Sequence, residues 1–162
     1  MSELTIRPVR AEDAEALNEL RRRDAVAQFI PSFSSEREGA TRKYIESFGP
    51  NDHVFVAELD GRVVAQAGLH VREGKLRHSA WVGLAVHDAF CGRGIGRALM
   101  EKLLDLADRW LGLLRVDLTV VSNNERAIGL YEKLGFVLEG TQRKASYFDG
   151  RYWDIVLMAR VK

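Results

Sequence analysis

"VHDAFCGRGIGRALM", residues 86–100, says more about the fold of this chain than any other stretch. An apolar, strand-like run ends at Val86, a loop with glycines at 92, 94 and 96 follows, and the periodic pattern of an amphipathic helix then begins. Glycines let a backbone approach a ligand closely, and the first turn of a helix carries unpaired N–H groups and a partial positive charge. The stretch therefore predicts a loop that holds a phosphate group, with Arg93 and Arg97 adding positive charge.

The same glycines also suit a tight turn in which glycine serves packing alone, and spacing by itself leaves that alternative open. A dinucleotide-binding loop requires Gly-x-Gly-x-x-Gly directly after the first strand, with an acidic residue about 20 positions further on. Here the third glycine is missing at that spacing, and three other strands are predicted to come before. A P-loop requires Gly-Lys followed by Ser or Thr, which does not occur here.

Alternation, helix propensity and turn residues place further elements on both sides of this loop. Before it, we predict a strand over Leu4–Arg10, a helix over Ala11–Ala27, a helix capped by Ser34 or Ser35 that ends near Phe48, and strands over 53–59, 62–71 and His78–Val86. After it, we predict a helix over Gly94–Gly112, a strand over Arg115–Val121, a short helix opened by Asn123 or Asn124, and strands over Phe136–Phe148 and Arg151–Val161.

This order predicts an α/β protein with a mixed, mostly antiparallel sheet of about seven strands and helices on both faces. The long helix between the fourth and fifth strands makes those two strands parallel neighbours. Asp60-Gly61 and Asp149-Gly150 each join two strand-like runs, which indicates β-hairpins. The long helix has an apolar stripe made of Ile95, Leu99, Leu103, Leu106 and Trp110.

Composition narrows the class of protein. The chain has 162 residues, which fits one domain over 1–162, and 46% of them are hydrophobic. With 24 basic and 23 acidic residues, no electrostatic footprint for nucleic acid or an anionic membrane is present. The start of the chain alternates polar and apolar residues, unlike a signal peptide, and Cys91 has no second cysteine to pair with. We therefore expect a cytoplasmic protein with no nucleic acid, membrane or metal partner.

A second motif follows about 30 residues after the glycine loop, in "LTVVSNNERAIGLYEKLGF", residues 118–136. Together the two motifs resemble the GNAT superfamily of N-acetyltransferases, which has a Gln/Arg-x-x-Gly-x-Gly/Ala loop after its fourth strand and an Asn-x-x-Ala-x-x-Leu-Tyr helix followed by Gly-Phe. The ending "DGRYWDIVLMARVK" is similar to the subgroup of amino-acid acetyltransferases that contains the enterobacterial protein YhhY. The first motif falls on Cys91, Gly94 and Gly96, and the second on Asn124, Ala127, Leu130, Tyr131, Gly135 and Phe136.

This resemblance implies the GNAT fold and acetyl-CoA as cosubstrate. It implies that the end of the fourth strand offers backbone groups to the pantetheine arm, that the loop holds the pyrophosphate, and that the later helix contributes a further contact and an acid. The residues expected to bind acetyl-CoA are Leu84, Ala85, Val86, Cys91, Gly92, Arg93, Gly94, Ile95, Gly96, Arg97, Asn124, Ala127 and Tyr131. Cys91 replaces the Gln or Arg of the family, and we interpret it as a small loop residue and not as a nucleophile.

The resemblance further implies direct attack of an amine on the thioester. Tyr131 is the candidate acid for the leaving thiolate. Comparable enzymes often use a glutamate on the fourth strand as base, but here Trp81 lies near that position, so His78 is the candidate base. A water chain, or an amine that loses its proton before binding, is the alternative. The candidate substrate-binding residues are Phe29, Phe33, Trp81 and Tyr147.

Three functions follow from these features. The first is acetylation of a small primary amine, an amino acid or a related compound. The second is acetylation of a protein or peptide, and the third is non-catalytic binding of acyl-CoA. The resemblance also allows a homodimer.

Overall fold

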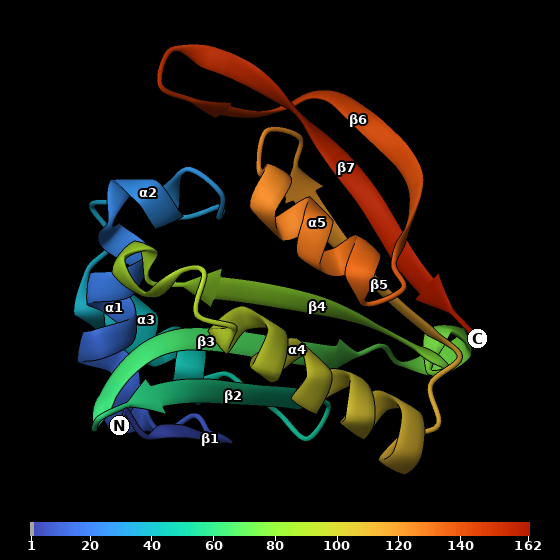
Figure 1. Ribbon diagram of the computed structural model, residues 1–162, viewed down its shortest axis with the longest axis horizontal. Coiled ribbons are helices and arrows are strands. Elements are labelled where there is room, and N and C mark those ends of the chain that lie inside the picture. The colour runs from blue at the N-terminus through green and yellow to red at the C-terminus, as the bar shows by residue number, and fades with distance from the viewer. Residues whose placement is uncertain (1) are drawn as a thin grey trace. The chain divides into compact units, whose positions relative to one another are not determined.

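The computed structural model describes residues 2–162 and contains seven strands, as the sequence predicts (Figure 1). The strands form one sheet in the order β1-β2-β3-β4-β5-β7-β6, in which β4 and β5 are parallel. The predicted α/β fold class is therefore confirmed.

The strands are β1 Leu4–Pro8, β2 Asp52–Leu59, β3 Arg62–Val71, β4 Ser79–Val86, β5 Arg115–Val121, β6 Val137–Phe148 and β7 Arg151–Val161. The helices are α1 Ala14–Arg22, α2 Asp24–Ala27, α3 Glu38–Glu46, α4 Ile95–Asp105 and α5 Glu125–Lys133, with short turns η1 Ala11–Asp13, η2 Gly74–Leu76 and η3 Asp88–Phe90, and a wider turn η4 Leu106–Trp110.

The chain divides into two compact units, whose boundaries fall inside β3 and β4 and at the end of α4. The first unit comprises residues 2–70 and Leu84–Leu104, and the second comprises Val71–Gly83 and Asp105–Lys162. The prediction of one domain over 1–162 stays a prediction, and residue 1 lies outside the described residues.

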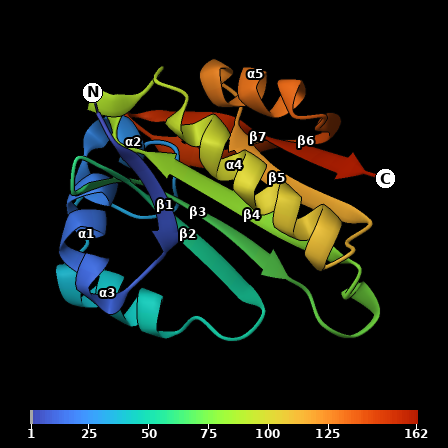
Figure 2. The same cartoon turned by 60° about the horizontal axis from the view of Figure 1, so that its bottom comes forward.

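Helices α1 and α3 lie side by side in the first unit and cover one face of its strands (Figure 2). Strand residues alternate between the two faces. Val56 of β2 and Val63 of β3 pack with Leu17 of α1 and Ile45 of α3, and all four are buried. Phe55, which points the other way, lies under the ammonium group of Lys102 of α4, 5.7 Å from it. Alternation along β2 therefore separates the α1–α3 face from the α4 face.

The predicted helix over Ala11–Ala27 is wrong, because the chain breaks at Arg23. Arg23 is extended, with φ −67° and ψ 128°, and it separates α1 from α2. Two nitrogens of the Arg23 guanidinium, Nε and Nη2, bind the carboxylate of Asp88, which follows β4 in the chain. A distant ion pair thus accompanies the break, and nothing in the local helix propensity indicates it.

The helix predicted to start at Ser34 or Ser35 starts at Glu38 instead. The preceding segment is held by polar side chains of α1. Arg21 pairs with Glu36 at 2.8 Å, and the amide of the buried Asn18 donates to the Glu36 carbonyl at 2.9 Å. The buried hydroxyl of Thr41 also donates to the Glu36 carboxylate. These bonds hold Glu36 outside the helix.

In the second unit, β5 pairs with β7 and β7 pairs with β6, and α5 lies along these strands (Figure 1). Asp149 and Gly150 both have positive φ, 50° and 73°, so the predicted hairpin turn is confirmed. The Asp60-Gly61 turn of the first unit has the same conformation, with φ 50° and 80°. Two positive φ values in succession match the right-handed twist of a hairpin.

The end of the long helix differs from the prediction. The α-helix stops at Asp105, and Leu106–Trp110 form a wider π-helical turn. Ile95, Leu99 and Leu103 are buried as predicted, but Trp110 is 74% exposed. The extra residue in the wide turn rotates the following side chains about the axis, so Trp110 leaves the apolar stripe and Ala107 is buried in its place.

We expect Leu17→Ala to lower the free energy of unfolding by about 3 kcal/mol, because Leu17 is fully buried against α3 and the strands and its loss leaves a cavity. The matched control is Leu76→Ala, where the side chain is 56% exposed and the change should stay within about 0.5 kcal/mol. Urea unfolding followed by circular dichroism measures both. Equal losses in the two variants would contradict this core.

Candidate functional site

Two glycines of the predicted phosphate loop have conformations that other residues rarely adopt. Gly92 has φ 76° and Gly94 has φ 78°. A Cβ atom added at either position would meet nothing within 4 Å. The glycines are therefore required by the backbone conformation and not by crowding from the protein. This geometry leaves the backbone of the loop open to a ligand.

The loop leads directly into α4. The amide of Ala98 donates to the Gly94 carbonyl at 3.0 Å, so Gly94 caps the helix, and the N–H groups of the first turn have no acceptor within the helix. Arg93 is exposed, with its guanidinium 5.1 Å from the centre of the Phe90 ring. Arg97 is exposed and pairs with Glu101 at 2.8 Å. Free amides, a helix dipole and two arginines suit an anionic phosphate.

The parallel ladder between β4 and β5 is short. It joins Ser79–Trp81 to Arg115–Asp117, although both strands continue beyond it. Within the described second unit, Val82 and Gly83 have no pairing partner on β5. Leu84, Ala85 and Val86, the predicted pantetheine contacts, complete β4 and are half-buried. Backbone groups that a ladder leaves unpaired need another partner, so the end of β4 can bind an extended ligand.

Helix α5 begins at the second motif. Asn124 is its N-cap, and the side-chain oxygen of Asn124 accepts a hydrogen bond from the Ala127 amide at 3.4 Å. The side-chain NH₂ group of Asn124 is a separate donor. Tyr131 lies on the inner stripe of the helix, 6% exposed, with its ring centre 5.9 Å from that of Phe136. Burial raises the pKa of Tyr131 to about 12.

Cys91 has no arrangement that would make it a nucleophile. Its sulfur lies 3.8 Å from the backbone oxygen of His87 and not beside the imidazole. The His87 ring accepts the Ala89 amide through Nδ1, and the Asp88 carboxylate binds Arg23. The neighbouring histidine and aspartate are thus engaged elsewhere, which agrees with Cys91 as a small loop residue.

His78 lies at the other end of β4 from the loop. It is exposed and precedes the strand, and its carbonyl accepts the amides of Leu114 and Arg115. The eight residues of β4 separate it from His87, where the loop begins. The role of His78 as the base stays a prediction.

The four aromatic candidates for substrate binding are not ordinary core residues. Phe33 is 79% exposed, Tyr147 is 61% exposed and Trp81 is 43% exposed. Phe29 is half-buried just after α2. Phe29 and Phe33 belong to the first unit, and Trp81 and Tyr147 to the second. Of these four side chains, Phe33 and Tyr147 are the most exposed.

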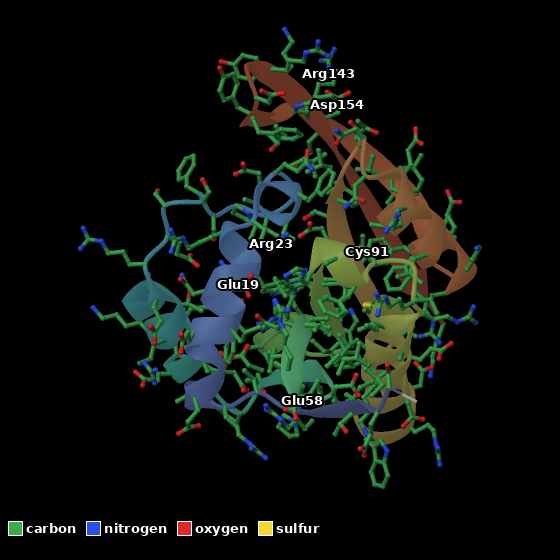
Figure 3. All side chains as sticks on the ribbon, turned by 60° about the vertical axis from the view of Figure 1, so that its left-hand side comes forward. Glu19, Arg23, Glu58, Cys91, Arg143 and Asp154 are labelled. Atoms are coloured by element: carbon green, nitrogen blue, oxygen red, sulfur yellow. The ribbon has the colours of Figure 1, made fainter. Side chains whose placement is uncertain are left out.

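Two features of the structure near the candidate residues are not predicted by the sequence. One is the link from Arg23 to Asp88, two residues after β4. The other is a bulge in β6, where the register shifts between Gln142 and Ser146, Lys144 has φ 51°, and the Asp154 carboxylate accepts the Lys144 amide at 2.9 Å. Figure 3 shows Asp154 on the hairpin near Arg143, and Arg23 on the helical part of the first unit. No local sequence signal announces the ion pair, and the β-branched and aromatic content of β6 conceals the bulge.

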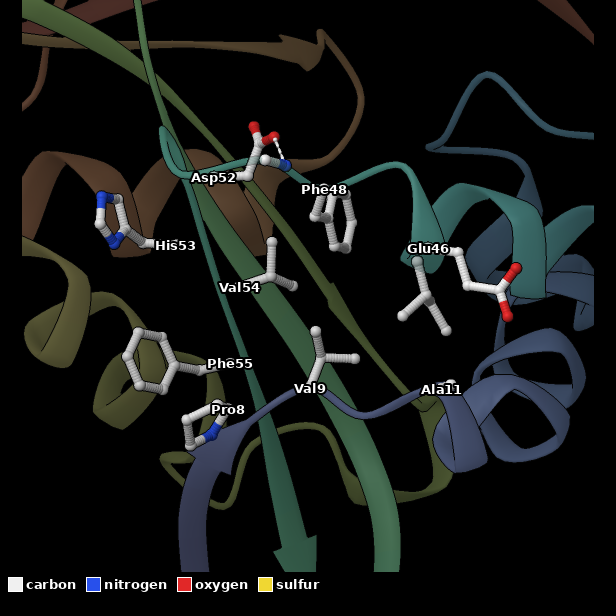
Figure 4. Close-up of a pocket in the computed structure, with 11 residues that line it drawn as sticks. Pro8, Val9, Ala11, Glu46, Phe48, Asp52, His53, Val54 and Phe55 are labelled. Atoms are coloured by element: carbon white, nitrogen blue, oxygen red, sulfur yellow. Dashed lines mark hydrogen bonds between the residues drawn. The ribbon is translucent and has the colours of Figure 1, made fainter.

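A hollow of about 450 Å³ opens in the first unit (Figure 4). It lies among the ends of β1 and α3 and the start of β2, and it includes Phe48, Asp52 and His53. The Asp52 carboxylate is already bound to the Gly49 amide at 2.8 Å and to His70 at 2.6 Å. None of the predicted site residues lines this hollow, so we base the functional site on the loop and the strand end.

Among residues 2–162, no helix is long and apolar enough to cross a membrane. No cluster of three or more His, Cys, Asp or Glu side chains in that range is arranged to hold a metal ion.

Comparison with known proteins gives a consistent result. Residues 14–136 match the model of the acetyltransferase (GNAT) family. The chain is 32% identical over 163 residues to the L-amino acid N-acetyltransferase AaaT of Escherichia coli, covering 100% of both chains. Its fold is similar to a GNAT-family acetyltransferase from Streptococcus pneumoniae, with a TM-score of 0.85, 26% identity, and coverage of 99% of this chain and 100% of the other.

A second similar structure is yncA of Salmonella typhimurium, described as a putative acetyltransferase with its cofactor acetyl-CoA. Its TM-score is 0.86 at 24% identity, with 98% of this chain and 94% of the other covered. The chain described here belongs to the GNAT family of acetyltransferases. It is an N-acetyltransferase.

We expect Gly94→Val to weaken acetyl-CoA binding about tenfold or more. A β-branched residue is strained at φ 78°, so the loop must change its conformation. The matched control is Gly74→Val, because Gly74 has φ 61°, has open space around it and lies outside the loop. Calorimetric titration with acetyl-CoA measures both variants. An unchanged dissociation constant in Gly94→Val would refute the assignment of the loop.

Proposed function

We propose that this acetyltransferase acts on the primary amine of a small molecule, an amino acid or a related amine, by direct attack on acetyl-CoA. The observation that carries the proposal is the full-length similarity to an L-amino acid N-acetyltransferase. The exposed aromatic side chains Phe33, Trp81 and Tyr147 support an acceptor with an apolar side chain.

The cosubstrate would be held in three places. The loop Gly92–Arg97 would bind the pyrophosphate through backbone amides of the first turn of α4, supported by the open left-handed glycines. The end of β4, Leu84–Val86, would bind the pantetheine arm through backbone groups, supported by the short β4–β5 ladder. The NH₂ group of Asn124 would donate to a pantetheine carbonyl, since its oxygen is used in capping α5.

In the reaction, the amine nitrogen attacks the thioester carbon, a C–N bond forms and the C–S bond breaks. The amine loses one proton and the departing thiolate takes one. A backbone N–H of β4 would stabilise the oxyanion that forms in between. No acyl-enzyme is needed, which fits the position of the Cys91 sulfur against a backbone carbonyl.

The raised pKa of Tyr131 limits its role. Full proton transfer from a phenol of pKa about 12 to a thiolate whose acid has a pKa of about 8.5 is uphill by about 5 kcal/mol. A hydrogen bond from the hydroxyl to the developing thiolate does not carry this penalty. We therefore propose that Tyr131 stabilises the leaving group mainly as a hydrogen-bond donor.

The proton of the amine goes to water in this proposal. His78 lies beyond the other end of β4, and Trp81 occupies the strand position where a carboxylate would be expected. An amine that loses its proton before binding needs no protein base. The rate should then rise with pH as more of the free amine is neutral.

We expect Tyr131→Phe to lower kcat about 100-fold while the dissociation constant of acetyl-CoA changes less than about threefold. Phenylalanine keeps the packing against Phe136 and removes only the hydroxyl. The control is Tyr152→Phe, at a tyrosine that is 65% exposed on β7. Release of CoA thiol measures kcat, and activity within twofold of the wild type would remove Tyr131 from the chemistry.

The pH dependence tests the state of Tyr131 separately. With a pKa of about 12, its hydroxyl stays protonated throughout the usual assay range. The rate of the wild type should therefore rise with pH and reach a plateau. Between pH 8 and about pH 10, it should show no fall that is missing from Tyr131→Phe. Such a fall would show that the phenol ionises at a lower pH than its burial indicates.

The acceptor is identified by CoA thiol release with a panel of amines: the amino acids, phosphinothricin-like amines, polyamines, aminoglycosides and short peptides. We expect turnover with amino acids or related small amines. Turnover with peptides alone would favour a protein acceptor. Binding of acetyl-CoA without turnover on any class would contradict the proposed small-molecule reaction.

A further inference from the structure

The turn that connects β4 to the glycine loop is built around His87. His87 is 3% exposed, and its backbone amide donates to the Val64 carbonyl of β3 at 2.9 Å. Its carbonyl accepts the Phe90 amide at 2.8 Å, and its Nδ1 accepts the Ala89 amide at 3.1 Å. The Cys91 amide then donates to the Asp88 carbonyl at 3.3 Å. The path of the backbone into Gly92 is therefore set by residues 87–91.

Side chains from α1 and β3 surround this turn. The Nε2 atom of His87 lies 3.3 Å from a guanidinium nitrogen of Arg62 and 3.6 Å from the Glu19 carboxylate. Glu19 also lies 3.4 Å from Arg62, and Arg62 lies over the Phe90 ring at 5.5 Å. The polar atoms of the turn are thus in contact with the end of α1.

Arg23 makes the strongest of these contacts. Its Nε and Nη2 each bind one oxygen of the Asp88 carboxylate, the second at 3.1 Å. The hydrogen bonds from Arg23 lower the pKa of Asp88 below its ordinary value. Arg23 also lies 3.5 Å from Glu19, four residues earlier in α1 (Figure 3). A two-bond arginine–carboxylate pair fixes orientation as well as distance.

The pair joins two segments that the sequence separates by 65 residues. On one side, Arg23 is the single extended residue between α1 and α2, ahead of Phe29 and Phe33. On the other side, Asp88 begins η3, which leads into Gly92–Arg97. The side chains are 37% and 36% exposed, so the pair is not required to fill the core.

We infer that Arg23 and Asp88 are positioning residues for acetyl-CoA binding: their ion pair holds the turn after β4 in the conformation that presents the glycine loop to the pyrophosphate. The inference rests on the proposed assignment of Gly92–Arg97 to the cosubstrate. It also connects the break between α1 and α2 with the loop, because the extended residue at that break, Arg23, is the one that binds Asp88.

The test is calorimetric titration of the full chain with acetyl-CoA, using Arg23→Ala, Asp88→Asn and the double variant. Asn keeps the size of the side chain and removes its charge. We expect each single variant to raise the dissociation constant about fivefold, the scale of a partly exposed two-bond pair. The double variant should lose no more than either single one, because both changes break the same contact.

The chain offers a matched control in Arg115 and Glu139. This pair also has two bonds, at 2.9 and 2.5 Å, and similar exposure, 34% and 41%, but it joins β5 to β6. Glu139→Gln should leave the dissociation constant within twofold of the wild type. Thermal unfolding of all variants separates lost binding from lost stability, since a merely structural pair would lower the midpoint in both cases without a selective effect on binding.

Each outcome of the titrations either supports or contradicts the positioning role of Arg23 and Asp88. Dissociation constants within twofold of the wild type in both single variants would overturn the positioning role. So would losses that multiply in the double variant, or an equal loss in Glu139→Gln. A wild-type chain that binds no acetyl-CoA would instead reject the proposed loop assignment, and the inference with it.

Discussion

The parallel ladder between β4 and β5 ends after three residue pairs, and the proposed binding of the cosubstrate depends on that early end. A fully paired sheet would use the backbone groups of both strands and leave nothing for a ligand to bind. Here Val82 and Gly83 lack a partner on β5, and β4 continues to Val86 before the turn. Unpaired backbone groups are costly when buried without a partner, so a cosubstrate that supplies hydrogen bonds is favoured there.

The glycine loop adds a second constraint of the same kind. Gly92 and Gly94 occupy the left-handed region, which exposes the backbone without any side chain in the way. The first turn of α4 then provides amides and a partial positive charge. Strand end, loop and helix are consecutive in the chain, so one short segment supplies most of the predicted contacts to the cosubstrate.

Polar side chains hold the surrounding segments in place. Arg21, Asn18 and Thr41 converge on Glu36 ahead of α3, and Arg23 binds Asp88 ahead of the loop. These contacts explain why two helix boundaries differ from prediction. A helix propensity of a few tenths of a kcal/mol per residue is outweighed by a bidentate ion pair or a buried hydrogen-bond network.

The sequence by itself determined the order of the strands along the chain, the two hairpin turns, the parallel pair and the glycine loop that precedes α4. Each of these follows from local rules: alternation, Asp-Gly at a turn, and glycines between a strand and an amphipathic helix. The motif residues Asn124 and Tyr131 were also found, and the structure adds that one caps α5 and the other is buried.

Only the tertiary structure decided the break at Arg23, the late start of α3, the exposure of Trp110 and the bulge that Asp154 holds. The physical reason is common to them all. Their partners are distant in the sequence or their geometry depends on how a turn widens, and no local pattern encodes a contact with a residue 65 positions away.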